Sequence, residues 1–117
     1  MLTDRATELG RLIGQTSEYQ AVKRANDALN QDKAAMALLE KMEGLRLDAQ
    51  KMIERGDNPT PDMERQLDTL LGEVQTNATY QRVVVANENF DKVMMQVNQW
   101  ILDGIRKGAA SPIITLG

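Results

Sequence analysis

The sequence predicts an all-α fold, a long antiparallel helical hairpin or bundle with short N-terminal helices packed alongside. The first observation is an apolar stripe within residues 33–55 at alternating spacings of three and four: Ala35, Leu38, Met42, Leu45, Ala49 and Met52. This spacing places six side chains on one helix face, and its mean of about 3.5 residues suits a helix lying along another helix. A second stripe follows a short turn, at Met63, Leu67, Leu70 and Val74. No convincing strand pattern precedes the last residues of the chain.

Two short helices are expected before the long stripe. The first is predicted from about Thr3 to Ile13, with Thr3 as its N-cap. Its apolar face comprises Leu2, Ala6, Leu9 and Ile13. Ser17 is predicted to open the second helix, where Gln20, three residues on, completes a capping box. Asp32 can then cap the third helix, which carries the long stripe.

A short turn separates the two striped segments. Gly56 lies where a left-handed C-terminal cap would end the third helix. Thr60 is a natural N-cap, and Pro61 suits the first position of the fourth helix. Two striped helices joined by so short a turn should fold back on each other as an antiparallel hairpin.

The fifth helix is the longest, from about Ala78 to Lys107, with Gly108 as its stop. Its expected apolar line comprises Val83, Asn87, Phe90, Met94, Val97 and Ile101. Residues 1–108 are therefore predicted to form a single helical domain, and residues 109–117 a C-terminal tail.

The tail combines a helix breaker with apolar residues. Pro112 prevents helix from continuing, whereas Ile113, Ile114 and Leu116 are more apolar than a solvated linker requires. Two interpretations stay open. The segment from Pro112 to Leu116 docks in an extended form on a helix or a neighbouring subunit, or it is a frayed end.

Composition argues against several classes of function. The chain has no histidine and no cysteine, so we expect no catalytic nucleophile–base pair, no metal site and no cofactor. A net charge of -3 argues against direct binding of nucleic acid. Neither an apolar signal-peptide core nor a run long enough for membrane insertion is present. These features favour a non-enzymatic cytoplasmic protein.

Function is therefore expected in surfaces that bind other proteins. The third and fifth helices carry longer stripes than the fourth can cover, which predicts a homo-oligomer, with a dimer favoured. The candidate interaction residues are Met42, Leu45, Ala49, Met52, Phe90, Met94, Val97 and Trp100. For the methionines and Phe90, membership of the core is the competing interpretation. Trp100 lies one step off the fifth stripe beside Ile101, and facing an interface is one interpretation, since an apolar flank with Val93 and Val97 would need cover.

The order of helices resembles the YlbF/YmcA family of small all-helical bacterial proteins. The resembling stretches are residues 12–20, 25–29, 32–45 and 87–94, the last leading to Val97 and Ile101. The resemblance implies a helical protein that oligomerises and acts through protein partners. Its best-known members join a complex that modulates a membrane-anchored ribonuclease. Some members ligate an iron–sulfur cluster through cysteines, which this chain lacks.

Two functional hypotheses follow from these observations. The first is a non-enzymatic protein–protein interaction module, an oligomeric regulatory subunit resembling those that modulate a ribonuclease complex. The alternative is a helical chaperone-like clamp that binds apolar client segments, suggested by the methionine-containing stripes. A defined set of copurifying partners would support the regulator, whereas many unfolded clients would support the clamp.

Overall fold

A computed structural model describes residues 1–110, which form five helices and no strand, so the all-α prediction is confirmed. The helices are α1 (Leu2–Gly14), α2 (Ser17–Gln31), α3 (Lys33–Glu54), α4 (Pro61–Thr76) and α5 (Ala78–Ala110). The predicted stop at Gly108 is wrong, because α5 continues to Ala110. A glycine inside a helix costs only about 1 kcal/mol relative to alanine, and alanines follow Gly108. The expectations for Pro112 to Leu116 lie outside the described residues.

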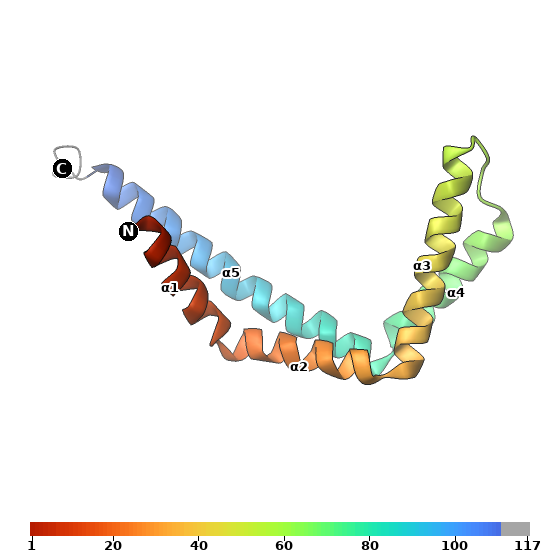
Figure 1. The fold of residues 1–117 in the computed structure, drawn as a ribbon, viewed down its shortest axis with the longest axis horizontal. Coiled ribbons are helices and arrows are strands. Elements are labelled where there is room, and N and C mark those ends of the chain that lie inside the picture. Colours follow the sequence, from red (N-terminus) through yellow and green to blue (C-terminus); the bar gives the residue numbers. More distant parts are fainter. Residues whose placement is uncertain (111–117) are drawn as a thin grey trace.

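The helices form two arms that meet at a vertex (Figure 1). In the long arm α2 packs mainly on α5, and α1 continues from α2 toward the free end. In the short arm α3 and α4 form the predicted antiparallel hairpin. The principal extents are 66 × 36 × 19 Å and the radius of gyration is 21.6 Å. A compact domain of this length would have a radius of roughly 13 Å, so most helices have few neighbours.

Side-chain caps begin α2, α3, α4 and α5, and those of α3 and α4 lie where predicted. Asp32 accepts a hydrogen bond from the Ala35 N–H at 3.0 Å, and Thr60 accepts one from the Met63 N–H at 3.2 Å. The cap of α2 is Thr16, which accepts from the Tyr19 N–H, so the proposed capping box at Ser17 is wrong.

Two further predicted details at the N-terminal helices are also corrected. The Gln20 side chain donates instead to the Gly14 carbonyl at 2.9 Å, which ties the end of α1 to the start of α2. Thr3 does not cap α1, because the helix begins at Leu2 and the Met1 carbonyl already accepts from the Arg5 N–H.

Gly56 ends α3 in the left-handed conformation that the sequence predicts, with φ of 87°. The Gly56 N–H donates to the Ile53 carbonyl at 3.0 Å, and the Asp57 N–H donates to the Met52 carbonyl at 2.8 Å. This pair of bonds is a Schellman motif, which satisfies the last carbonyls of the helix and reverses the chain. The reversal returns α4 along α3.

The α3–α4 hairpin is held by the two predicted apolar stripes. Ala35 and Val74 are buried, and the other stripe residues are half-buried: Leu38, Met42, Leu45, Ala49, Met52, Met63, Leu67 and Leu70. The spacing in the sequence therefore identified the seam correctly. Only two helices meet there, so most of these side chains keep some contact with solvent.

The long arm has a small core of its own. Ala25, Val83 and Ala86 are buried where α2 crosses α5, with Ala21, Val22 and Leu29 packed around them. Tyr19 and Phe90 extend this contact, with ring centroids 5.3 Å apart and a tilted arrangement favourable for aromatic pairs. Val97 is the last buried residue of α5.

A carboxylate joins the two arms at the vertex. One oxygen of Asp32 caps α3, and the other accepts a hydrogen bond from the Thr79 hydroxyl in the first turn of α5 at 2.8 Å. The bond from the Ala35 N–H, and then the bond from Thr79, lower the pKa of Asp32 below its usual range. Asn77 caps α5 beside it by accepting from the Tyr80 N–H at 2.9 Å.

Replacing Val74 should test the hairpin seam. Val74 is 2 % exposed, so we expect Val74→Ala to lower the free energy of unfolding by about 2 kcal/mol. Leu71→Ala is the matched control, because Leu71 lies on the same helix with 43 % of its surface exposed. Urea unfolding of both variants measures the difference, and an equal loss at the two positions would contradict the assigned seam.

Removing the Asp32 carboxylate should change how stability depends on pH. Because the folded-state pKa is lowered, the carboxylate stabilises the fold above its unfolded pKa of about 3.9, and this contribution disappears as the pH falls through the folded pKa. Asp32→Ala should therefore melt at a lower temperature than wild type near neutral pH, and the two curves should converge in acid. Thermal melts across this range, with Asp27→Ala as control, provide the measurement; a constant gap would count against the vertex bonds.

Candidate interaction surfaces

Several large apolar side chains are uncovered along α1 and the outer part of α5 in the long arm. We define the distal surface as Leu2 and Leu12 from α1, together with Trp100, Ile101, Leu102 and Ile105 from α5. Leu2 is 85 % exposed, Trp100 62 % and Ile105 59 %. Trp100 is thus exposed in the single chain, and the interface expected for it stays a prediction.

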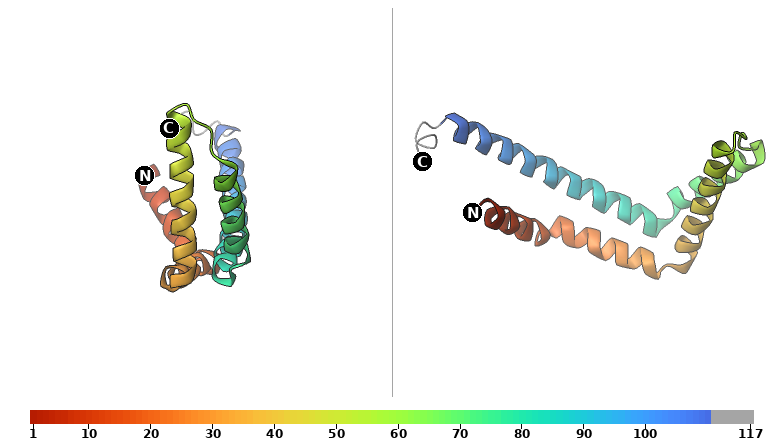
Figure 2. Two further views of the ribbon diagram at one scale, coloured as in Figure 1. Left: turned by 90° about the vertical axis from the view of Figure 1, so that its right-hand side faces the viewer. Right: turned by 45° about the horizontal axis from the view of Figure 1, so that its top comes forward.

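The distal surface exists because α5 is longer than the helices beside it. The 33 residues of α5 span roughly 50 Å, whereas the 15 residues of α2 span only about 22 Å. The next helix, α1, contacts chiefly α2 and contains no buried residue. The free ends of α1 and α5 diverge (Figure 2). Beyond Val97, no residue of α5 within the described part of the chain is buried.

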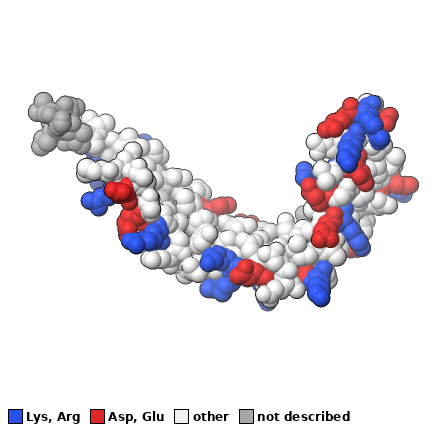
Figure 3. All heavy atoms as spheres, in the orientation of Figure 1, with Lys and Arg blue, Asp and Glu red and all other residues white. Residues whose placement is uncertain are grey.

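Charged side chains are sparser along part of α5 than along the other helices. Figure 3 shows charged side chains crowded over the α3–α4 arm and along α1 and α2, whereas much of α5 carries few. No charged residue occurs between Lys92 and Asp103. An apolar face without charge is costly to leave in water, and extended faces of this kind usually bind another protein.

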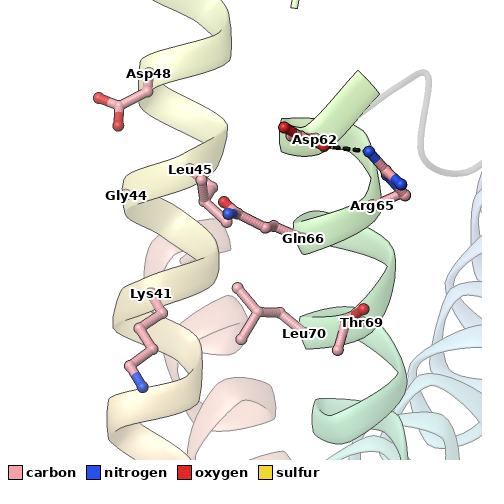
Figure 4. A pocket seen from close by; sticks show the side chains of 9 residues that line it. All are labelled: Lys41, Gly44, Leu45, Asp48, Asp62, Arg65, Gln66, Thr69 and Leu70. Carbon is pink, nitrogen blue, oxygen red and sulfur yellow. Dashed lines mark hydrogen bonds and ion pairs between the residues drawn. The ribbon is translucent and has the colours of Figure 1, made fainter. Parts of the chain in front are cut away.

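A second surface is the hairpin groove, a depression of about 680 Å³ between α3 and α4. Its lining residues are Lys41, Gly44, Leu45, Asp48, Asp62, Arg65, Gln66, Thr69 and Leu70. Leu45, Gln66 and Leu70 fill the space between the helices, and the charged side chains lie around it (Figure 4). The groove therefore has an apolar floor and a charged rim, the arrangement typical of a site for a partner helix.

Some charged groups on the rim of the groove are already in an ion pair, and others are not. Arg65 and Asp62 pair with each other across one turn of α4. Lys41 and Asp48 on α3 form no ion pair within residues 1–110. Gly44 lies between them, and a Cβ built at Gly44 would meet no atom within 4 Å. These three positions are open to an approaching molecule.

The predicted interaction residues fall into three groups. Met42, Leu45, Ala49 and Met52 form the hairpin seam, where Leu45 also lines the groove. Phe90 and Met94 are half-buried and Val97 is buried, so these three lie within the long arm. Trp100 belongs to the distal surface. Their role in binding a partner stays a prediction.

Sequence reasoning missed several residues of both surfaces. Ile105 follows Ile101 by four residues and continues the α5 stripe, a signal that was available in the sequence. Lys41, Gly44 and Asp48 also repeat at helical spacing, one step beside the seam. Within residues 1–110 no cluster of acidic, histidine or cysteine side chains could hold a metal ion, and no helix there is long and apolar enough to cross a bilayer.

Comparison with known proteins agrees with this architecture. The family profile described as "Control of competence regulator ComK, YlbF/YmcA" matches residues 2–106, nearly all of the chain. The chain belongs to the YlbF/YmcA family. Among YlbF/YmcA-like relatives, a "UPF0342 protein" of Limosilactobacillus reuteri is 29% identical over 103 residues, covering 88% of this chain and 84% of the relative. Another, from Limosilactobacillus fermentum, is 30% identical over 98 residues, covering 84% and 82%.

A solved structure shows the same fold. It is titled "Protein of Unknown Function (DUF964) from Bacillus stearothermophilus", and it superposes with a TM-score of 0.64 at 20% identity. The match covers 95% of this chain and 97% of the other. The arrangement of five helices is therefore shared by this YlbF/YmcA protein and the solved protein.

Proposed function

We propose that this protein is a non-enzymatic regulatory subunit of the bacterial cytoplasm that self-associates and acts by binding other proteins. The observation that carries the proposal is the distal surface, six large apolar side chains that are exposed on α1 and on the outer part of α5. By helix spacing, Trp100, Ile101 and Ile105 fall on one side of α5, and exposed apolar patches on soluble proteins commonly mark interaction sites. A second copy of the distal surface would cover the first in a two-fold dimer.

Family membership supports a regulatory role. The family description refers to control of a competence regulator, and the profile matches residues 2–106 of this chain. We propose a multi-protein complex as the setting, of the kind in which resembling members modulate a ribonuclease. The absence of histidine and cysteine from the sequence supports a role in binding rather than in acid–base or nucleophilic chemistry.

The exposed methionine and leucine side chains also keep the chaperone-like clamp as a second candidate. Met95 is 71 % exposed and Leu102 is 47 % exposed, and flexible apolar side chains can accommodate varied clients. The two candidates differ in what they bind. A regulator captures a small set of folded partners in fixed ratios, whereas a clamp captures many unfolded chains.

A charge on the distal surface should disrupt self-association. Burying an unpaired carboxylate in an apolar contact is strongly unfavourable, so Ile105→Asp should reduce the dimer association constant at least about tenfold. Ile53→Asp is the matched control, because Ile53 is 62 % exposed against 59 % for Ile105 and lies on the other arm. Sedimentation equilibrium at micromolar concentration measures both variants beside the wild type.

The same pair of variants tests partner binding in the native cell. Affinity purification with mass spectrometry should return a defined complex with wild type and Ile53→Asp, and a depleted one with Ile105→Asp. A wild-type chain that stays at 13.1 kDa and copurifies with no partner would refute the proposed function. A large, variable set of unfolded proteins would favour the clamp.

A further inference from the structure

The exposed flank of α3 carries a short line of residues with opposite charges on the two sides of a glycine. Ala37, Lys41, Gly44 and Asp48 follow at spacings of four, three and four, so they lie along one line beside the hairpin seam, and all four are exposed. Beside the groove, the line has a positive charge, Lys41, on one side of Gly44 and a negative charge, Asp48, on the other, and it continues beyond the groove to the exposed Lys51. If α3 is laid antiparallel on a copy of itself, the order of charges becomes complementary.

The hairpin groove has the same polarity as this line. Toward the turn between α3 and α4, the rim holds Asp48 together with the paired Asp62 and Arg65, which leaves this end with one net negative charge. Toward the vertex, the only charged group of the rim within the described residues is Lys41. A helix that lies over the groove should therefore present a positive charge at the turn end and a negative charge at the vertex end.

We propose that α3 of a second copy of this chain lies antiparallel over the hairpin groove, around a two-fold axis between Gly44 and Leu45. In this arrangement Lys41 of each copy faces Asp48 of the other, so two ion pairs form at once. A parallel arrangement would place Lys41 against Lys41 and Asp48 against Asp48, which like-charge repulsion disfavours. The charges thus select both the occupant and its direction.

The backbone at the centre of the groove permits this approach. Gly44 has no side chain, and the position opposite it under the two-fold axis is Leu45, whose side chain lies at the groove floor. Close approach of two helices requires a small residue at the crossing point, because a longer side chain would hold the axes apart. Glu43 and Arg46, which pair with each other, lie on other faces of α3 and leave this flank free.

This interface deepens the proposed self-association and rests on it, but it uses a different arm from the distal surface. The two surfaces can therefore be occupied together, and the groove would join chains that are already paired through α1 and α5. To separate the two contacts, we choose Ile105→Asp as the background in which the groove is tested.

The decisive test is a charge reversal and its repair in the Ile105→Asp background. Lys41→Glu alone and Asp48→Lys alone should each weaken dimerisation at least about tenfold, because each creates two like-charge contacts. The double variant Lys41→Glu with Asp48→Lys should recover association to within about threefold of the parent, because both pairs form again with opposite polarity. Sedimentation equilibrium measures association, and added salt should weaken the parent dimer.

A glycine pair supplies a test that does not depend on charge. Gly44→Gln and Gly72→Gln both replace an exposed mid-helix glycine whose surroundings leave space for a side chain. Both should keep or raise the melting temperature, since glutamine favours helix over glycine. Only Gly44→Gln should weaken groove association, by about tenfold or more, because the added side chain separates the helices.

The outcomes distinguish this inference from the proposed function. A wild-type dimer that becomes a strict monomer with Ile105→Asp would overturn the groove interface and leave the proposed function intact. The groove interface would also be overturned if dimerisation of the Ile105→Asp protein were unchanged by the single charge reversals, or if the double variant did not restore it. A wild-type chain that is monomeric and binds no partner would overturn both. Recovery by the double variant together with selective weakening by Gly44→Gln would establish the interface.

Discussion

Each helix of this protein has one main packing neighbour along most of its length, and the rest of the structure depends on this constraint. The α3–α4 seam is two helices deep, so its leucines and methionines are half-buried rather than enclosed. The α2–α5 contact is similarly thin, and it ends near Val97 while α5 continues. In a four-helix bundle, apolar stripes of this kind would be enclosed in the core. Here one part of each stripe packs on the neighbouring helix, and the other part stays on the outer surface.

The vertex determines how these thin pairs are placed relative to one another. Asp32 ends one arm and begins the other, because the residue that terminates α2 also caps α3 and accepts a hydrogen bond from α5. At the start of α5, Thr79 donates a hydrogen bond to Asp32, and Asn77 caps the helix. Local capping groups, which satisfy helix ends in any protein, here also connect segments 47 positions apart. The angle between the arms therefore depends on a few polar groups rather than on a broad apolar contact.

Local features of the sequence predicted most of the fold. The stripe from Ala35 to Met52, the Gly56 cap and the Thr60–Pro61 start depend on residues close in the chain, and each appears as expected. Errors occurred where neighbouring residues compete for one role. Thr16 and Ser17 can both cap a helix, and only the extended conformation at Thr16 decides between them. Gly108 can end a helix or continue it, and the following alanines favour continuation.

The interaction surfaces were harder to predict, for a different physical reason. Periodicity identifies an apolar face but not which part of it a neighbour covers, so Val97 and Trp100 were grouped together although one is buried and the other exposed. That distinction depends on the lengths of α1 and α2 relative to α5, a property of the whole arrangement. The order of charges along α3 is visible in the sequence, but its meaning appears only when the groove beside it is known.

The small number of enclosed side chains affects how much folded protein a cell would maintain. Only six apolar residues are buried within the described part of the chain, too few to expect a very stable isolated fold. Folding and binding are then linked, because a partner that binds only the native chain shifts the folding equilibrium toward the folded state. Copies made in excess of their partners would spend more time open to proteases. Under the proposed function, the supply of partners would in this way regulate the amount of folded protein.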